Sequence, residues 1–114
     1  MNKETPLMRR LQLAATTLGS RLLRNNVGQT VTKDGRVIRY GLAVGSSDLI
    51  GWTPVRIGPE HVGQTLAVFT AVEVKVPGSY PTKQQRDFLA AVQAAGGIGL
   101  VARNEDDLRR GILR

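Results

Sequence analysis

The chain of 114 residues contains no cysteine, a single histidine and only 4% aromatic residues. The absence of cysteine excludes disulfides and thiolate metal sites, and zinc fingers with them. His61 stands alone in a Gly-Pro turn, so nothing indicates a histidine-based metal site or nuclease. No apolar run approaches the roughly 18 residues of a membrane span. The start, "MNKETPLMRR", lacks the apolar centre of a secretory signal. These absences predict a cytoplasmic protein with no membrane partner.

Charge of one sign is abundant. Sixteen Lys and Arg stand against nine Asp and Glu, which gives a net charge of +7. An excess of this size predicts a polyanionic partner such as nucleic acid, although basic residues also serve solubility. The length fits one domain, residues 1–114, with one modest core.

Hydrophobic spacing and turn residues predict an α/β fold with a mixed sheet flanked by helices. In the first helix, Leu7, Leu11, Ala14, Ala15 and Leu18 should face inward, and Gly19 should end the helix. The remaining elements follow in the order strand, hairpin, strand, strand, helix, strand, helix. They are expected at 21–28, 30–42 (with Asp34-Gly35 at the turn), 46–57 (broken near Pro54), 64–76 (the longest strand), 83–97 (a helix ended by Gly96-Gly97), 98–103 and 104–113.

The stretch "TAVEVKV", residues 70–76, places two charges in an otherwise apolar, β-branched strand that should be buried from end to end. Alternation puts Glu73 and Lys75 on the same face, roughly 7 Å apart along the strand. Burial of either charge alone costs several kcal/mol, so each needs a partner, a metal ion or water. The alternative is that the strand end emerges into solvent and the pair is an ordinary surface salt bridge.

Asp48 stands between a Gly-Ser-Ser turn and the apolar Leu49-Ile50. An Asx turn or a strand end is the alternative explanation. If its strand pairs antiparallel with strand 64–76, Asp48 converges on Glu73, and two such carboxylates repel unless a divalent cation lies between them. Oxygen ligands without Cys or clustered His suit Mg²⁺ or Mn²⁺. Lys75 would then hold or deprotonate a metal-activated water, which suits hydrolysis of a phosphodiester.

Five motifs, in this order and spacing, resemble the VRR-NUC domain, a branch of the PD-(D/E)XK nuclease superfamily, in the small stand-alone form often found in bacteriophages. They are "LLRNNVG", "YGLAVGSSDLIG", "VEVK", "TKQQRDFL" and "AAGGIGLVARNEDDL". Each motif alone is weak, whereas five in register are specific. The resemblance covers nearly all of the chain. It implies a restriction-endonuclease-like core, α-β-β-β-α-β, here with an additional β-hairpin and a C-terminal helix, in a bacterial or bacteriophage-infected cell.

The resemblance also implies roles for single residues. Asp48 matches the metal-binding aspartate, with Ser47 in place of the superfamily's proline, which shapes the backbone and carries no chemistry. Glu73 and Lys75 match the E-x-K carboxylate and lysine, and Val74 would offer its backbone carbonyl to the metal.

Two further residues are candidates for the site. Gln85 matches the glutamine of the family's Q-x-x-[WF] helix, with Phe88 as the aromatic, and there helps to organise the site. Thr82 and Gln85 also fit a capping box, in which Gln85 merely satisfies a backbone N–H. Family members carry a glutamate on the first helix, and Glu4 is the candidate here. Pro6 prefers the first helical turn, so Glu4 could instead precede the helix.

Other polar residues have plainer explanations. Glu105, Asp106 and Asp107 follow a good cap, Asn104, and acids in a first helical turn are favoured by the helix dipole. Tyr80, in the loop after the E-x-K motif, is a candidate DNA contact, with packing as the alternative.

Basic residues near the expected cleft are candidates for phosphate contacts, although each could be an ordinary solvated charge. Asn25 joins them because the family places its segment near the site. The set is Arg9, Arg10, Arg21, Arg24, Asn25, Lys83 and Arg86.

The prediction is a Mg²⁺- or Mn²⁺-dependent DNA endonuclease with no nucleotide cofactor. The resemblance implies a homodimer that acts on branched DNA such as four-way junctions. A non-catalytic basic nucleic-acid-binding module is the alternative from another class. The same chemistry on single-stranded or flap DNA, or on RNA, is a further one.

Overall fold

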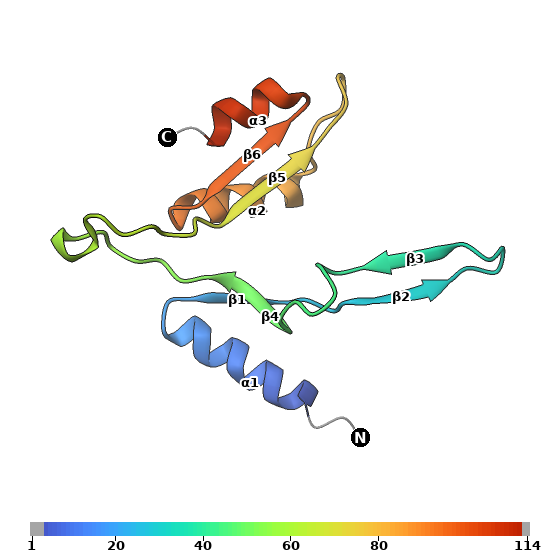
Figure 1. Ribbon diagram of the computed structural model, residues 1–114, viewed down its shortest axis with the longest axis horizontal. Coiled ribbons are helices and arrows are strands. Elements are labelled where there is room, and N and C mark those ends of the chain that lie inside the picture. Colours follow the sequence, from blue (N-terminus) through green and yellow to red (C-terminus); the bar gives the residue numbers. More distant parts are fainter. Residues whose placement is uncertain (1–3, 113–114) are drawn as a thin grey trace. The chain divides into compact units, whose positions relative to one another are not determined.

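A computed structural model describes residues 4–112 of the chain, which divides into two units, Met1–Thr53 and Pro54–Arg114 (Figure 1). The described residues contain three α-helices together with antiparallel and parallel strand pairs. The predicted mixed α/β class is therefore confirmed. That the chain acts as one domain over residues 1–114 stays a prediction.

The first unit contains one helix and two antiparallel strand pairs. Its elements are α1 (Glu4–Thr17), β1 (Arg21–Arg24), β2 (Gly28–Val31), β3 (Val37–Tyr40) and β4 (Leu49–Trp52). β1 pairs with β4, and β2 pairs with β3. The chain therefore passes between the two ladders twice, first as segment 25–27 from β1 to β2 and then as segment 41–48 from β3 to β4. β4 ends before Pro54, as predicted.

α1 ends where the sequence predicts, but its less exposed face differs from the predicted inward stripe. Gly19 has a φ of 88°, and the Ser20 N–H donates to the Ala15 carbonyl, five residues earlier, at 2.8 Å. This is the six-to-one hydrogen bond of a Schellman motif. Of the predicted inward stripe only Ala15 is buried, and the four other members are exposed. The Gln12 amide donates to the Leu22 carbonyl of β1 at 3.1 Å. The half-buried Thr5, Met8 and Gln12 lie with Ala15 on one face, about a quarter of a turn from the centre of the predicted stripe.

The predicted hairpin is present, with Asp34 and Gly35 in its turn. Gly35 has a φ of 87°, and its N–H donates to the Thr32 carbonyl at 3.0 Å. The Thr32 hydroxyl also donates to the Asp34 carboxylate. This bond, followed by the bond from the Arg36 guanidinium, lowers the pKa of Asp34.

The second unit is built around a parallel pair. Its elements are the 3₁₀ helix η1 (Pro59–His61), β5 (Thr70–Val74), α2 (Lys83–Ala94), β6 (Ile98–Ala102) and α3 (Glu105–Ile112). β5 pairs with β6 in parallel. A Cβ at Gly99 of β6 would meet Leu89 of α2, and one at Gly111 of α3 would meet Leu100 of β6. Because successive strand residues face opposite sides, α2 and α3 cover opposite faces of β6 (Figure 1).

The strand predicted at 64–76 is shorter and more exposed than expected. β5 spans five residues, the same length as β6, and residues 64–69 have no regular structure. Ala71 and Glu73 are half-buried, whereas Val72 and Val74 are exposed. α2 contacts both β5 and β6, and α3 contacts β6. Burial from end to end was therefore wrong, because the helices of this unit cover one face of β5.

α2 begins and ends as the sequence predicts. Thr82 caps its first turn, and Gly96, with a φ of 94°, follows its last. Leu89 and Val92 are buried and form the centre of the core of this unit. The predicted last helix is present as α3, and Leu113 at its expected end lies outside the described residues.

Candidate active site

Glu73 and Lys75 form an ion pair at the carboxyl end of β5. Lys75 Nζ lies 3.4 Å from Glu73 Oε1, and the lysine and glutamate side chains are only 20% and 28% exposed. The Lys83–Asp87 pair on α2, by contrast, is 82% and 63% exposed. The predicted placement of both charges on one side of the strand is confirmed. Their limited exposure distinguishes them from an ordinary surface pair, because less water screens the interaction.

The backbone of β5 directs the Val74 carbonyl away from its partner strand. The Lys75 N–H donates to the Ala102 carbonyl at 3.1 Å. Backbone groups of successive residues in a strand alternate between its two edges. The carbonyl of Val74 therefore lies on the edge of β5 opposite to β6.

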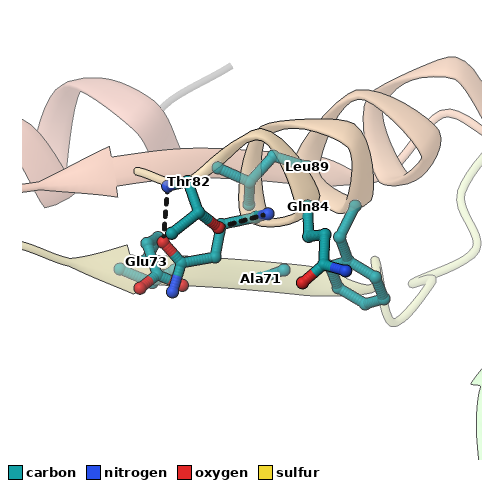
Figure 2. A pocket seen from close by; sticks show the side chains of 8 residues that line it. Ala71, Glu73, Thr82, Gln84 and Leu89 are labelled. Carbon is teal, nitrogen blue, oxygen red and sulfur yellow. Dashed lines mark hydrogen bonds between the residues drawn. The ribbon is translucent and has the colours of Figure 1, made fainter. Parts of the chain in front are cut away.

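A cavity of about 570 Å³ opens between β5 and the start of α2. Figure 2 shows Glu73 on the strand below Thr82, with Gln84 further along the start of the helix. Gln85 contributes a further polar group, and Phe88 forms part of the apolar wall. The cavity thus combines one carboxylate, two amides and a hydroxyl on an apolar floor, which is the character of a ligand site.

Gln85 takes part in a capping box and lines this cavity as well. Its Oε1 accepts from the Thr82 N–H at 2.9 Å, and its own N–H donates to Thr82 Oγ1 at 3.1 Å (Figure 2). The alternative explanation from the sequence is therefore confirmed. It does not compete with a role in the site, because the cap uses Oε1 and the Nε2 amide can still donate into the cavity.

Asp48, in the first unit, ends the segment 41–48 and immediately precedes β4. Its side chain is exposed, and its carbonyl accepts from the Asn25 N–H at 2.9 Å. The convergence of Asp48 on Glu73 joins residues of different units and stays a prediction.

Asn25 holds the segment that leads to Asp48. Its Nδ2 donates to Ser46 Oγ at 2.7 Å and to the Ser47 carbonyl at 2.9 Å. Its Oδ1 accepts from the Leu42 N–H at 3.0 Å. One half-buried amide therefore bonds near both ends of the segment. The sequence placed Asn25 among DNA contacts, and this supporting role was missed because no local spacing rule links residue 25 to residues 42–47.

The basic candidates of the first unit lie in a strongly positive part of the chain. Residues 1–53 carry eight Lys or Arg and three Asp or Glu, a net charge of +5 out of +7. Arg9 and Arg10 are exposed on α1. Arg21 stacks over the Trp52 ring at 5.4 Å, while Arg24 lies opposite Leu49 in the β1–β4 ladder. Their contacts with DNA stay predictions.

The basic candidates of the second unit both bind groups of the protein. Lys83 pairs with Asp87 at 2.8 Å, and Arg86 Nη1 donates to the Pro81 carbonyl at 2.7 Å. Both side chains are exposed, so these interactions leave them accessible to DNA.

The remaining acidic residues divide into two cases. Glu4 is exposed, and as the first residue of α1 it belongs to the helix rather than preceding it.

Glu105, Asp106 and Asp107 occupy the first turn of α3, as the structural explanation predicted. Asp107 Oδ2 accepts from the Arg103 N–H at 2.9 Å, and this bond, followed by that from Arg110, lowers the pKa of Asp107. Within residues 4–112, no three His, Cys, Asp or Glu side chains gather as a metal cluster.

Comparison with known proteins places these residues in a family. The family model of the VRR-NUC domain matches residues 7–105. The chain belongs to the VRR-NUC family. The resemblance found in the motifs is confirmed, and the match includes Asp48, the Glu73–Lys75 segment and Gln85 but begins after Glu4. The chain matches none of the curated proteins and none of the solved structures with which it was compared.

Membership of the VRR-NUC family indicates a nuclease-type function with DNA as the substrate. Nucleases of the PD-(D/E)XK type usually use divalent metals. Across residues 4–112, no helix is both long and apolar enough to cross a membrane.

Proposed function

We propose that this VRR-NUC domain is a divalent-metal-dependent endonuclease that hydrolyses phosphodiester bonds of DNA. The observation that carries the proposal is the Glu73–Lys75 pair, with a nitrogen–oxygen distance of 3.4 Å and limited exposure. Glu73 shares its cavity with the amide of Gln85. A carboxylate, a cation and an amide beside an open cavity are groups that suit phosphodiester hydrolysis.

The proposed metal ligands are the carboxylates of Asp48 and Glu73 and the carbonyl of Val74, with Glu4 as a further candidate. All are oxygen donors, which fits Mg²⁺ or Mn²⁺. When bound, such a cation supplies a polarised phosphate and an activated water. The ammonium of Lys75 positions the attacking water and stabilises negative charge. Gln85 keeps the cavity side of the site in place from the first turn of α2.

For the substrate we propose branched DNA, in particular four-way junctions, bound by a homodimer. Two copies would present two sites and cut two strands. The charge of +5 on residues 1–53 supports binding of the sugar-phosphate backbone. Light scattering should give twice the mass of the chain, and a monomer that cuts junctions on both strands would overturn this part.

The test is cleavage of four-way, flap, duplex and single-stranded DNA in the presence of Mn²⁺. Asp48→Asn and Glu73→Gln should each lower the rate by about 100-fold or more, because each removes a proposed metal ligand. Glu60→Gln, which neutralises an exposed carboxylate of η1, is the matched control and should cut as the unaltered protein does. Undiminished cutting by Asp48→Asn or Glu73→Gln would overturn the assignment of that residue. Preferential cutting of flap or single-stranded DNA would keep the chemistry and change the substrate.

The charge of residues 1–53 also favours a second candidate, a basic module that binds nucleic acid without cutting it. Such a module should bind DNA equally well with and without Mn²⁺, and Asp48→Asn should bind at least as tightly, because it removes a negative charge. A proposed nuclease site should instead bind Mn²⁺ with a dependence on Asp48. A titration of Mn²⁺ followed by electron paramagnetic resonance distinguishes the two.

A further inference from the structure

The loop between β5 and α2 is held in place by two arginines. Arg103 Nη2 donates to the Ser79 carbonyl at 2.7 Å, and Arg86 Nη1 donates to the Pro81 carbonyl at 2.7 Å. Arg103 follows the end of β6, where its own N–H donates to Asp107 at 2.9 Å. The two guanidinium groups therefore fix the backbone on either side of Tyr80.

Tyr80 is presented to solvent by this loop. The Arg103 guanidinium carbon lies 5.2 Å from the centroid of the Tyr80 ring, within the range of a cation–π contact. The residue is nevertheless 75% exposed. A tyrosine that served only to pack the loop would bury its ring against apolar neighbours. Here the ring is ordered by one cation and remains open to a ligand.

We propose that Tyr80 and Arg103, the stacking pair, bind an unpaired nucleobase of the DNA substrate. Nucleobases stack on exposed aromatic rings whatever their sequence, and an arginine beside the ring adds attraction for base and phosphate. Bases inside an intact duplex are already stacked on their neighbours, so the pair selects a base that is free at a branch, flap or strand end.

The position of the stacking pair deepens the proposed nuclease function and rests on it. The loop that carries Tyr80 connects Lys75 with Thr82, and Thr82 lines the same cavity as Glu73. A base held on Tyr80 would therefore be bound on a loop whose two ends border the proposed site. The pair would supply preference for branched over continuous DNA from within a single copy of the chain.

The test measures binding in EDTA, where no cutting occurs. The probe is a forked duplex with 2-aminopurine in the unpaired arm beside the branch, and the matched control is a continuous duplex of the same sequence. Tyr80→Ala should weaken binding of the fork by about 5- to 100-fold, the range for loss of one stacked base. Binding of the continuous duplex should change by less than about twofold, since the phosphate contacts are untouched. Stacking should also change the fluorescence of the 2-aminopurine, and Tyr80→Ala should abolish this change.

Two further variants separate stacking from bulk and from the hydroxyl group. Tyr80→Phe keeps the ring and should bind the fork as the unaltered protein does, whereas Tyr80→Leu keeps apolar bulk and should behave as Tyr80→Ala. Equal losses for fork and duplex would overturn the proposal, as would a Leu variant as good as Phe or an unchanged fluorescence signal. Because binding is read without metal, the stacking pair can fail while Mn²⁺-dependent cutting persists. Equally, cutting can fail while stacking persists.

Discussion

The backbone N–H of Asn25 donates to the carbonyl of Asp48 at 2.9 Å, which joins the end of β1 to the start of β4. The amide of the same asparagine bonds to Leu42, Ser46 and Ser47. Four hydrogen bonds made by Asn25 therefore hold the backbone from which the Asp48 side chain extends. If Asp48 binds the metal, Asn25 is the residue that positions the Asp48 carboxylate.

Asn25→Ala should weaken Mn²⁺ binding at the proposed site. The variant loses three side-chain hydrogen bonds, at about 1 kcal/mol each, and frees the segment 41–48. We expect the Mn²⁺ concentration for half-maximal cutting to rise by about tenfold, with most of the rate recovered at saturating Mn²⁺. Asn26→Ala, an exposed neighbour, is the control and should cut normally. A loss of rate that saturating Mn²⁺ does not recover would contradict this positioning role.

The same segment offers a matched pair of glycines. Gly41 and Gly45 both have positive φ, of 81° and 87°, so alanine at either position costs about 1 kcal/mol in backbone strain. A Cβ at Gly41 would also clash with the Asn26 carbonyl, whereas one at Gly45 would meet nothing within 4 Å. Gly41→Ala should therefore lower the free energy of unfolding by about 2 kcal/mol more than Gly45→Ala does, as measured by urea denaturation. Equal losses would show that the segment shifts freely.

Two substitutions at Gln85 separate its cap from its place in the cavity. Gln85→Glu preserves the capping box, so its melting temperature should stay close to that of the unaltered protein. It also puts a second carboxylate into the cavity of Glu73, and the changed charge should alter the Mn²⁺ dependence of cutting. Gln85→Ala should lose about 1 kcal/mol of stability through the missing cap. If Gln85→Glu cuts with an unchanged Mn²⁺ dependence, Gln85 is a cap alone.

Features set by neighbouring residues were predictable from the sequence. Gly19 and Gly96 end their helices, because a residue with positive φ is required there. The Asp34-Gly35 turn and the Thr82–Gln85 cap depend likewise on contacts within a few residues. The placement of Glu73 and Lys75 on one side follows from strand alternation alone.

Features set by long-range contacts were not predictable in this way. The leucines of α1 indicated one buried face, yet the less exposed face is the one from which Gln12 bonds to Leu22. The apolar run before Thr70 indicated a long strand, but within residues 4–112 the ladder of β5 with β6 begins at Thr70. Asn25 is a similar case, since the partners of its side chain lie 17 to 22 residues away along the chain. The hydrophobic pattern of a segment shows which residues it could bury, whereas the element that packs against the segment determines which of them are buried.

Asp107 makes the stability of the second unit depend on pH. The bond from the Arg103 N–H, followed by that from Arg110, lowers the pKa of this carboxyl in the folded chain. Its contribution is therefore present above the unfolded pKa, about 3.9, and is lost as the pH falls through the lower folded pKa. Asp107→Asn should melt at a lower temperature at neutral pH, and the difference should shrink below about pH 4. Asp87→Asn, which breaks an exposed pair with Lys83, is the control and should change little at either pH.

Substitutions of Lys75 and of Glu73 should impair cutting in different ways, although the two residues form one ion pair. Glu73→Gln removes a proposed metal ligand and should weaken Mn²⁺ binding, whereas Lys75→Met removes a neighbouring positive charge and should leave Mn²⁺ binding equal or tighter. Single-turnover cutting at saturating Mn²⁺ should still fall by about 100-fold or more in Lys75→Met, because no cation then positions the water and stabilises the developing charge. Lys75→Arg keeps the charge and should recover part of the rate. Urea denaturation shows whether Lys75→Met is still folded, so that the loss of a pair only 20% and 28% exposed is not mistaken for the loss of the chemical step. Weaker Mn²⁺ binding in Lys75→Met would instead mean that the lysine supports the metal site and takes no part in the chemical step.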